Sequence, residues 1–291
     1  MQLSGLHLLL TYQCTLQCDH CFAWGSPWQS GTMRLSQIAE ILRQAAELGC
    51  VESIFFEGGE PCLYYPILLQ GVQEAAARGF RVGIVTNAYW ATEVEDAVTW
   101  LRPLAGLIQD LSVSTDLYHS DAVVSQQAVK ARAAADRLDI PVGTLTVAQP
   151  GEDDPAFDPV MFRGRAAEEL ADAVPHQPWE TFTTCPYEDL GDPGRVHIDP
   201  LGIVHLCQGI ALGNLFDTPL VELCATYEPA VHPIVSPLLK GGPAELARHY
   251  GFHPELTYAD GCHLCYETRC QLRQRFPEIL APDQMYGVVN G

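Results

Sequence analysis

Three cysteines near the start of the chain have a spacing that suits a metal cluster. They are Cys14, Cys18 and Cys21, in the pattern C-x3-C-x2-C, and they directly follow an apolar run. Cysteine thiolates are the ligands of iron–sulfur clusters. Three of them can hold three irons of a cubane cluster and leave the fourth iron open to a reacting ligand. A zinc ion is the alternative, with His20 as a fourth ligand, but structural zinc commonly uses two C-x2-C pairs and adjacent ligands make poor tetrahedral geometry.

The first two thirds of the chain alternate predicted strands with predicted helices. The strand before the cysteines, Leu6–Thr11, is apolar except for His7 and Thr11, and the helix after them, Leu35–Leu48, repeats apolar residues at helical spacing. Further strands are predicted over Ser53–Phe56, Arg81–Thr86, Leu111–Ser114 and Pro141–Val147, and further helices over Ile67–Ala77, Ala91–Leu101 and Ala122–Leu138. One more helix is expected within Asp158–Ala173. This order predicts an α/β fold, a parallel sheet or barrel with helices outside. Functional groups in such folds lie at the C-terminal ends of the strands.

A second motif, Glu57-Gly58-Gly59-Glu60-Pro61, ends the second predicted strand. Glycines let backbone approach closely, and a carboxylate or carbonyl oxygen can accept a hydrogen bond from an ammonium group. Alone, two glycines would indicate only a turn. In register after the second strand, and following C-x3-C-x2-C, the motif resembles the GGE motif of the radical S-adenosylmethionine (SAM) superfamily, whose hallmark is that cysteine spacing after the first barrel strand.

This resemblance covers about residues 5–150 and implies a partial (β/α) barrel with a [4Fe–4S] cluster on Cys14, Cys18 and Cys21. Family members usually have an aromatic residue where His20 stands, and an imidazole can also pack against adenine. The resemblance further implies that the SAM-binding residues are Gly58, Gly59, Glu60, Thr86, Asn87, Ser114 and Asp116. The last four can equally be turn or strand-end residues, which are often Ser, Thr, Asn or Asp. Tyr118 and His119 follow closely and are candidates for facing the substrate.

A second group of cysteines lies in the C-terminal third. A β-hairpin is predicted from Gly194–His197 and Ile203–Leu206, and Pro219–Tyr227 and Pro243–Tyr250 are predicted as short helices. Cysteines lie on both sides of the hairpin and in a later C-x2-C. This arrangement resembles the Twitch domain, the shorter relative of the SPASM domain, and implies one auxiliary [4Fe–4S] cluster.

By that resemblance the auxiliary ligands are Cys185, Cys207, Cys262 and Cys265. Cys270 is either a replacement for Cys265 or a free thiol. Zinc is a stronger alternative here than at the first site, because four thiolates that include C-x2-C are also a zinc pattern. We expect Cys50 in the core, and Cys62 in the core or facing the cavity. The predicted domains are a radical SAM partial barrel, residues 1–178, and a Twitch/SPASM-like auxiliary-cluster domain, residues 179–291.

The resemblance implies an oxidoreductase that cleaves SAM reductively to a 5′-deoxyadenosyl radical, which removes hydrogen from a substrate carbon. A flavodoxin- or ferredoxin-type protein would donate the electron. The leading hypothesis is dehydrogenation of a small molecule, with the auxiliary cluster accepting an electron. One alternative is cross-linking or epimerisation of a ribosomally made peptide, although the first strand starts almost at Met1 and leaves no room for a leader-binding domain. The other is a non-enzymatic iron–sulfur or metal-binding module, which would not need the Gly58-Gly59-Glu60 motif.

The amino-acid composition limits the kinds of partner and the cellular location that we expect for this protein. The net charge of −20 argues against nucleic acid, because phosphate binding depends on Lys and Arg. No apolar stretch is long enough to span a membrane, and the N-terminus lacks the basic region of a signal peptide, so we expect a cytoplasmic protein without a membrane partner. Eleven cysteines cannot all pair as disulfides, and in such a chain metal ligation is the expected use.

Overall fold

Most of the secondary structure belongs to one large sheet and the helices around it. The computed structural model describes residues 1–152, 154–252 and 255–288. The strands are β1 (Gly5–Thr11), β2 (Ser53–Gly58), β3 (Arg81–Thr86), β4 (Asp110–Ser114), β5 (Val142–Leu145), β6 (Gln177–Pro178), β7 (Arg195–Ile198), β8 (Ile203–Cys207), β9 (Ile210–Asn214) and β10 (Thr257–Tyr258). The α-helices are α1 (Leu35–Leu48), α2 (Tyr65–Ala77), α3 (Val94–Leu101), α4 (Gln126–Arg137), α5 (Arg165–Glu169), α6 (Leu220–Thr226), α7 (Val235–Tyr250) and α8 (Gly261–Leu272). Single 3-10 turns lie at Pro61–Tyr64, Arg102–Leu104, Ala171–Ala173, Trp179–Thr181 and Asp283–Tyr286.

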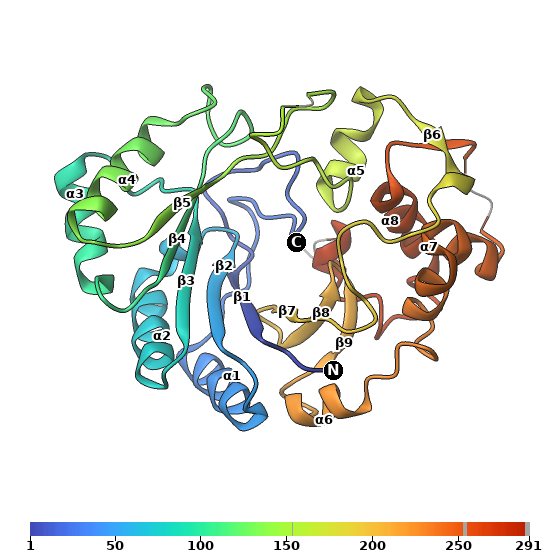
Figure 1. Ribbon diagram of the computed structural model, residues 1–291, viewed down its shortest axis with the longest axis horizontal. Coiled ribbons are helices and arrows are strands. Elements are labelled where there is room, and N and C mark those ends of the chain that lie inside the picture. The colour runs from blue at the N-terminus through green and yellow to red at the C-terminus, as the bar shows by residue number, and fades with distance from the viewer. Residues whose placement is uncertain (153, 253–254, 289–291) are drawn as a thin grey trace.

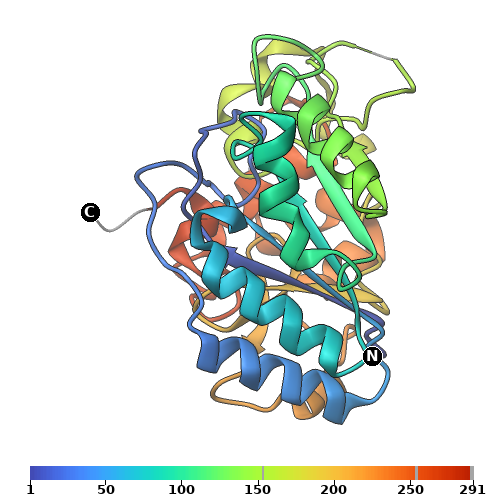
Figure 2. The same cartoon turned by 90° about the vertical axis from the view of Figure 1, so that its left-hand side faces the viewer.

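The large sheet has the strand order β5-β4-β3-β2-β1-β7-β8-β9 and is open at its two ends, while β6 and β10 form a separate pair. Strands β1 to β5 are parallel, and β7 is parallel to β1. Helices α1 to α4 lie along the outer side of the parallel strands (Figures 1 and 2). The predicted α/β partial barrel is confirmed, and it is not closed.

The amphipathic helices form where the apolar periodicity predicts them. Where a helix end differs from the prediction, a local contact explains the difference. Helix α1 has the predicted bounds, buries Ile38 and Ile41, and ends at Gly49 with a φ of 73°. Helix α4 begins at Gln126 rather than Ala122, because the Ser125 hydroxyl accepts a hydrogen bond from the Ala128 N–H and caps it there. Helix α3 begins three residues later than predicted.

The helix expected within Asp158–Ala173 is present as the short α5. The residue before α5, Gly164, has a φ of +61°, and a Cβ there would lie 2.8 Å from the backbone of Phe22. A side chain at residue 164 would therefore collide with the loop that carries the N-terminal cysteines, which lies directly against the start of α5.

The predicted hairpin is present as β7 and β8, and a third strand that the sequence did not indicate, β9, follows it. Because β7 pairs with β1, the hairpin extends the barrel sheet, with His197 beside His7. Helix α7 starts earlier than predicted and is interrupted by non-helical backbone at Gly241 and Gly242. The division into two domains stays a prediction.

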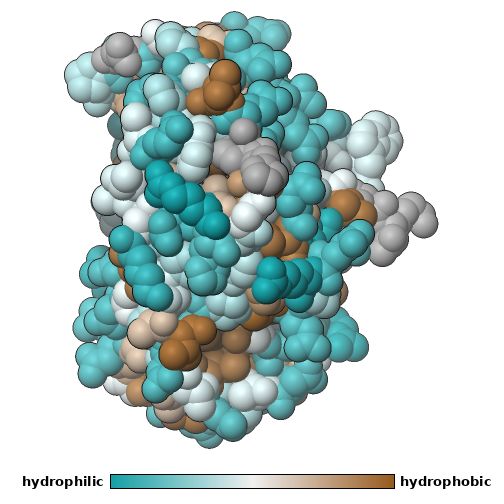
Figure 3. Space-filling model, turned by 90° about the vertical axis from the view of Figure 1, so that its right-hand side faces the viewer, coloured by the Kyte–Doolittle hydropathy of each residue, from teal (hydrophilic) through white to brown (hydrophobic). Residues whose placement is uncertain are grey.

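The surface over the C-terminal third is mixed. Figure 3 shows hydrophobic patches between hydrophilic side chains on the face that lies on the right in Figure 1. Exposed apolar side chains of this third include Val231, Leu239 and Leu256. None of the helices in the described residues combines the length and the apolar character that a membrane crossing requires.

Candidate active site

A cavity of about 620 Å³ lies at the carboxyl ends of the parallel strands and reaches down the inner face of the sheet. The loop after β1 contributes Cys14, Cys18 and Cys21 to its wall. Six of the seven predicted SAM-binding residues also line it, namely Gly58, Gly59, Thr86, Asn87, Ser114 and Asp116. The strand order therefore gathers residues from the carboxyl ends of four strands, β1 to β4, around one space.

The three N-terminal cysteines carry hydrogen-bond donors suited to thiolates. The Leu16 N–H donates to Cys14 Sγ at 3.4 Å, and the Gly25 N–H donates to Cys21 Sγ at 3.2 Å. Burial raises the pKa of the Cys14 thiol to about 11 and raises that of Cys18 well above its usual range. A bound metal cation reverses such a shift, because coordination deprotonates a thiol.

Arg165 binds the backbone of the loop that carries the three N-terminal cysteines. Its guanidinium donates to the carbonyl oxygens of Cys18 and Gly25 at 2.7 and 2.9 Å, and its carbon Cζ lies 5.3 Å from the centre of the Trp24 ring. The Arg165 N–H also donates to the Cys21 carbonyl. Arg165 thus fixes the backbone at both ends of the Cys18–Cys21 segment.

The two glycines after β2 allow the cysteine loop to lie directly against the sheet. Gly58 has a φ of +130°, and a Cβ there would lie 2.5 Å from the carbonyl oxygen of Thr11. A Cβ at Gly59 would lie 2.1 Å from the carbonyl oxygen of Gln13. Both contacts are with backbone and cannot be relieved by a rotamer change, so only glycine fits.

Glu60 is turned away from the cavity and joins two strand ends. Its side chain is fully buried and accepts hydrogen bonds from the Cys62 N–H, the Thr86 hydroxyl and the Asn87 N–H at 2.8 to 3.0 Å. Asn87 in turn donates through Nδ2 to Thr15 Oγ1 at 3.0 Å and lies 3.6 Å from Cys14 Sγ. Glu60 therefore positions Asn87 against the cysteine loop, an arrangement that disfavours direct contact of its carboxylate with SAM.

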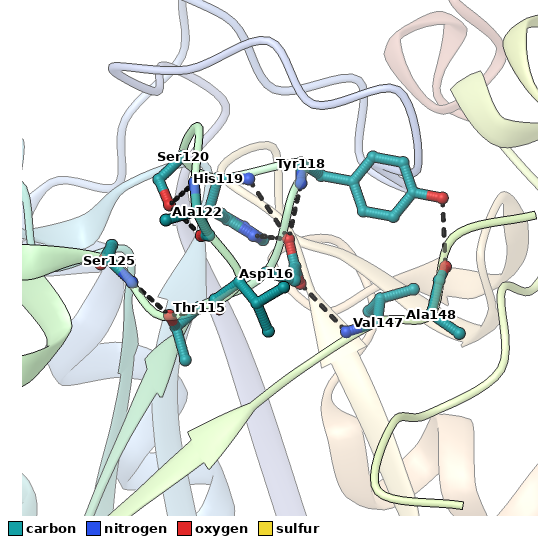
Figure 4. A network of polar contacts seen from close by, with 10 residues as sticks. Thr115, Asp116, Tyr118, His119, Ser120, Ala122, Ser125, Val147 and Ala148 are labelled. Carbon is teal, nitrogen blue, oxygen red and sulfur yellow. Dashed lines mark hydrogen bonds and ion pairs between the residues drawn. The ribbon is translucent and has the colours of Figure 1, made fainter. Parts of the chain in front are cut away.

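Asp116 joins the ends of β4 and β5. One carboxylate oxygen accepts hydrogen bonds from the backbone N–H groups of Tyr118 and His119 and contacts His119 Nδ1 at 2.7 Å (Figure 4). The other accepts from the Val147 N–H at 3.0 Å. Ser114 lies on the cavity wall beside it and makes the more accessible contact for a ligand.

The four cysteines predicted for the auxiliary cluster meet around a small enclosed cavity. Cys185, Cys207, Cys262 and Cys265 all line it. Cys270 is exposed and lies outside that lining. Cys262 and Cys265 are on α8, and Cys207 ends β8, so the hairpin and the helix supply three of the four thiols. Of the remaining cysteines, Cys62 and Cys224 are buried, whereas Cys50 is partly exposed rather than in the core.

Two buried arginines also line the four-cysteine cavity. Arg163 donates to Cys207 Sγ at 3.3 Å and pairs with Glu188 at 3.1 Å. Arg269 is 1% exposed and donates to the carbonyl oxygens of Cys265 and Gln208. Among the described residues no carboxylate pairs with Arg269. A buried cation without a carboxylate is costly unless other negative charge is present, and thiolates would supply it.

Several residues at the two cysteine sites were not identified from the sequence. Arg163 lines both cavities, and Arg165 holds the first cysteine loop. His7, Glu57 and His197 form a polar cluster on the cavity wall. The sequence held a signal for His7, the polar residue inside an apolar strand, but none for the arginines.

Comparisons with known proteins agree with this site. A family model described as the radical SAM superfamily matches residues 8–162, more than half of the chain. A putative peptide biosynthesis protein YydG of Bacillus subtilis is 26% identical over 117 residues, 40% of this chain and 37% of that protein. The tungsten-containing aldehyde ferredoxin oxidoreductase cofactor-modifying protein of Pyrococcus furiosus is 34% identical over 107 residues, 36% of this chain and 28% of that protein. The chain thus matches well under half of each relative's length.

One solved structure has a similar fold over nearly the whole chain. It is native anSMEcpe with bound AdoMet and Cp18Cys peptide, with a TM-score of 0.53 and 13% identity, and the match covers 94% of this chain and 97% of that one. The fold, the cysteine loop with its glycines and the family match lead to the same conclusion: this chain belongs to the radical SAM superfamily.

Proposed function

We propose that this enzyme modifies a peptide, with its reactive [4Fe–4S] cluster on Cys14, Cys18 and Cys21 and with SAM and the peptide in the large cavity. The observation on which this proposal rests is that the three cysteines, the glycines after β2 and Ser114 line one cavity of about 620 Å³. When bound, the cluster and SAM supply one-electron chemistry that removes hydrogen from an unactivated carbon. Members of the family are enzymes, so the non-enzymatic module is set aside.

The residues at the first site fit a cubane cluster better than a zinc ion. Two groups in the described residues place three His, Cys, Asp or Glu ligand atoms within 4.8 Å of one another, and neither contains a cysteine. Thiolates around one tetrahedral zinc ion would lie about 3.8 Å apart, given bonds of about 2.3 Å. A wider spacing suits a larger group, and the glycines leave room for a ligand beside it.

The remaining predicted contacts divide into two kinds. Ser114 and the backbone of Gly58 and Gly59 are placed to bind SAM directly. Glu60 and Asp116 are positioning residues, since their carboxylates are satisfied by the chain itself. His20 lines the cavity, and burial lowers its pKa to about 4, so its imidazole is neutral and can present a flat face to the adenine.

The four-cysteine cavity supports a second cluster that accepts an electron from the substrate radical. Full protein ligation leaves no iron open to SAM, and Arg163 and Arg269 place positive charge beside the thiolates. Arg163 also lines the large cavity, so the walls of the two cavities share this side chain. A second cluster next to the substrate cavity favours a reaction with net oxidation.

A peptide is now favoured over the small molecule of the leading hypothesis. YydG carries the name of a putative peptide biosynthesis protein, and the anSMEcpe structure contains a bound peptide. Neither the dehydrogenation of a small molecule nor a flavodoxin- or ferredoxin-type donor is supported by a specific observation here.

The test is SAM cleavage followed by peptide modification. The anaerobically reconstituted, dithionite-reduced enzyme should form 5′-deoxyadenosine, measured by mass spectrometry. A variant with alanine at Cys14, Cys18 and Cys21 should not, whereas Cys270→Ala should retain activity. Peptides encoded by small genes beside this one should gain a mass change, or transfer deuterium to 5′-deoxyadenosine when labelled. Equal 5′-deoxyadenosine from the triple variant would refute the cluster assignment.

A further inference from the structure

Three ionisable side chains on the inner face of the sheet have no role in the proposed function. They are His7 on β1, Glu57 on β2 and His197 on β7, and all three line the large cavity. The strand register brings them together, because His7 is the pairing partner of His197, and Glu57 follows Phe55, the partner of His7 on the other side. Three adjacent strands thus direct one group each to a single point.

The two imidazoles face the Glu57 carboxylate, one at each oxygen. His7 Nδ1 lies 3.3 Å from one carboxylate oxygen of Glu57, and His197 Nε2 lies 3.0 Å from the other. Among the described residues, neither His7 Nδ1 nor Glu57 Oε1, both buried, makes a well-aligned hydrogen bond. A buried unsatisfied polar atom calls for a missing ion or water.

The two nitrogen–oxygen distances match those between neighbouring ligands on one metal ion, and ligand atoms of all three residues lie within 4.8 Å of one another. Nitrogen and oxygen ligands lie about 2.0–2.2 Å from zinc, so two neighbouring ligands are about 2.9–3.5 Å apart. Two imidazoles and one carboxylate are a donor set that proteins use for Zn²⁺ and Fe²⁺ with positions left open.

We propose that His7, Glu57 and His197 bind one divalent ion of the zinc class, with its open positions facing the cavity. There the ion can take a carbonyl or carboxylate oxygen of the substrate. A second group, His20, Asp116 and His119, has similar spacing. It is the poorer site because Asp116 already accepts from the chain at both oxygens. The inference goes beyond the proposed function and does not depend on SAM cleavage.

Calorimetric titration with Zn²⁺ tests the site in the folded enzyme. The protein is reconstituted with its clusters, carries Cys270→Ala to remove the exposed thiol, and is treated with a chelator before titration. One Zn²⁺ per chain should bind, and Glu57→Gln or His197→Ala should each weaken binding by at least ~100-fold, the upper end for losing a supporting partner. Asp116→Asn and the exposed-site control His249→Ala should bind as the parent does.

Cluster absorbance and far-ultraviolet circular dichroism show whether each variant is folded, and His7→Gln provides a second ligand change if Glu57→Gln is not. Saturable binding that is lost in two ligand variants and kept in both controls supports the site. No saturable binding by the parent would overturn it, as would unchanged affinity in Glu57→Gln. Loss of binding in Asp116→Asn alone would place the ion at the other group and likewise overturn it.

Discussion

Replacing Arg165 with alanine should loosen the loop that carries the three N-terminal cysteines. The guanidinium donates to two carbonyl oxygens of that loop, those of Cys18 and Gly25, at 2.7 and 2.9 Å, and packs on Trp24. Arg165 is only 4% exposed, so water cannot readily replace these contacts. The substitution leaves the Gly25 carbonyl oxygen without a donor, and the Cys18 carbonyl oxygen keeps only the Cys21 N–H at 3.1 Å.

The size of the effect follows from these contacts. Each hydrogen bond from a charged donor contributes about 1.5–3 kcal/mol, and the cation–π contact adds about 1 kcal/mol. The gross sum of roughly 4–7 kcal/mol is offset by the cost of burying the guanidinium, which is several kcal/mol. We therefore expect the free energy of unfolding to fall by about 3 kcal/mol, more than the ~1 kcal/mol of an average substitution.

Urea denaturation of the cluster-free protein measures this difference. Arg132→Ala is the matched control, because Arg132 is exposed on α4 and its loss should change stability by less than about 0.5 kcal/mol. After reconstitution the Arg165→Ala enzyme should also carry about four fewer irons per chain, the content of one cubane. If both variants unfold at the same urea concentration, Arg165 does not hold the loop and the reasoning fails.

Three further predictions concern the same sites. Gly59→Ala should lower the free energy of unfolding, measured by urea denaturation, by about 3 kcal/mol or more, since its Cβ would lie 2.1 Å from the Gln13 carbonyl oxygen. The variant should also form no 5′-deoxyadenosine, and wild-type activity would show that the loop can move aside. Cys265→Ala should lower iron by about four per chain and Cys270→Ala should not, measured by iron analysis, and the reverse result would exchange the two assignments. Tyr12→Phe should cost about 1–3 kcal/mol of unfolding free energy, because Asp199 is fully buried and would lose a 2.7 Å hydrogen bond; an unchanged urea midpoint would mean that the bond contributes nothing.

The barrel was predictable because its elements are defined by local periodicity. Helix α1 and strand β3 have the predicted bounds, since each carries its own apolar pattern. The helix within Asp158–Ala173 was expected, but its short length and its start after Gly164 were not, and Gly164 lies against the loop around Phe22, more than a hundred residues earlier in the chain. Propensity within a segment cannot report such a contact.

The residues of the candidate site were also predictable only in part. Cysteines are rare and their spacing is informative, so the cysteines that line each cavity were identifiable. A glutamate in a strand-end motif was expected to bind a ligand, yet Glu60 has its oxygens occupied by Cys62, Thr86 and Asn87. The arginines carry no such signal, because surface arginines are common and only the tertiary structure shows which ones are buried beside a thiol. The position of His7 in an apolar strand was a signal, but the sequence did not show that Glu57 and His197 lie beside it.

The segment from Arg163 to Arg165 explains how the two cysteine sites stay in a fixed relation. Arg163 contacts Cys207 of the C-terminal group, while Arg165, two residues later, holds the carbonyl oxygens of the N-terminal loop. Gly164 between them lies against Phe22, where a side chain would collide. Opposite ends of a short stretch of backbone thus contact different sites. Electron transfer depends steeply on distance, so if both sites hold clusters, as proposed, this segment is placed to keep their separation constant.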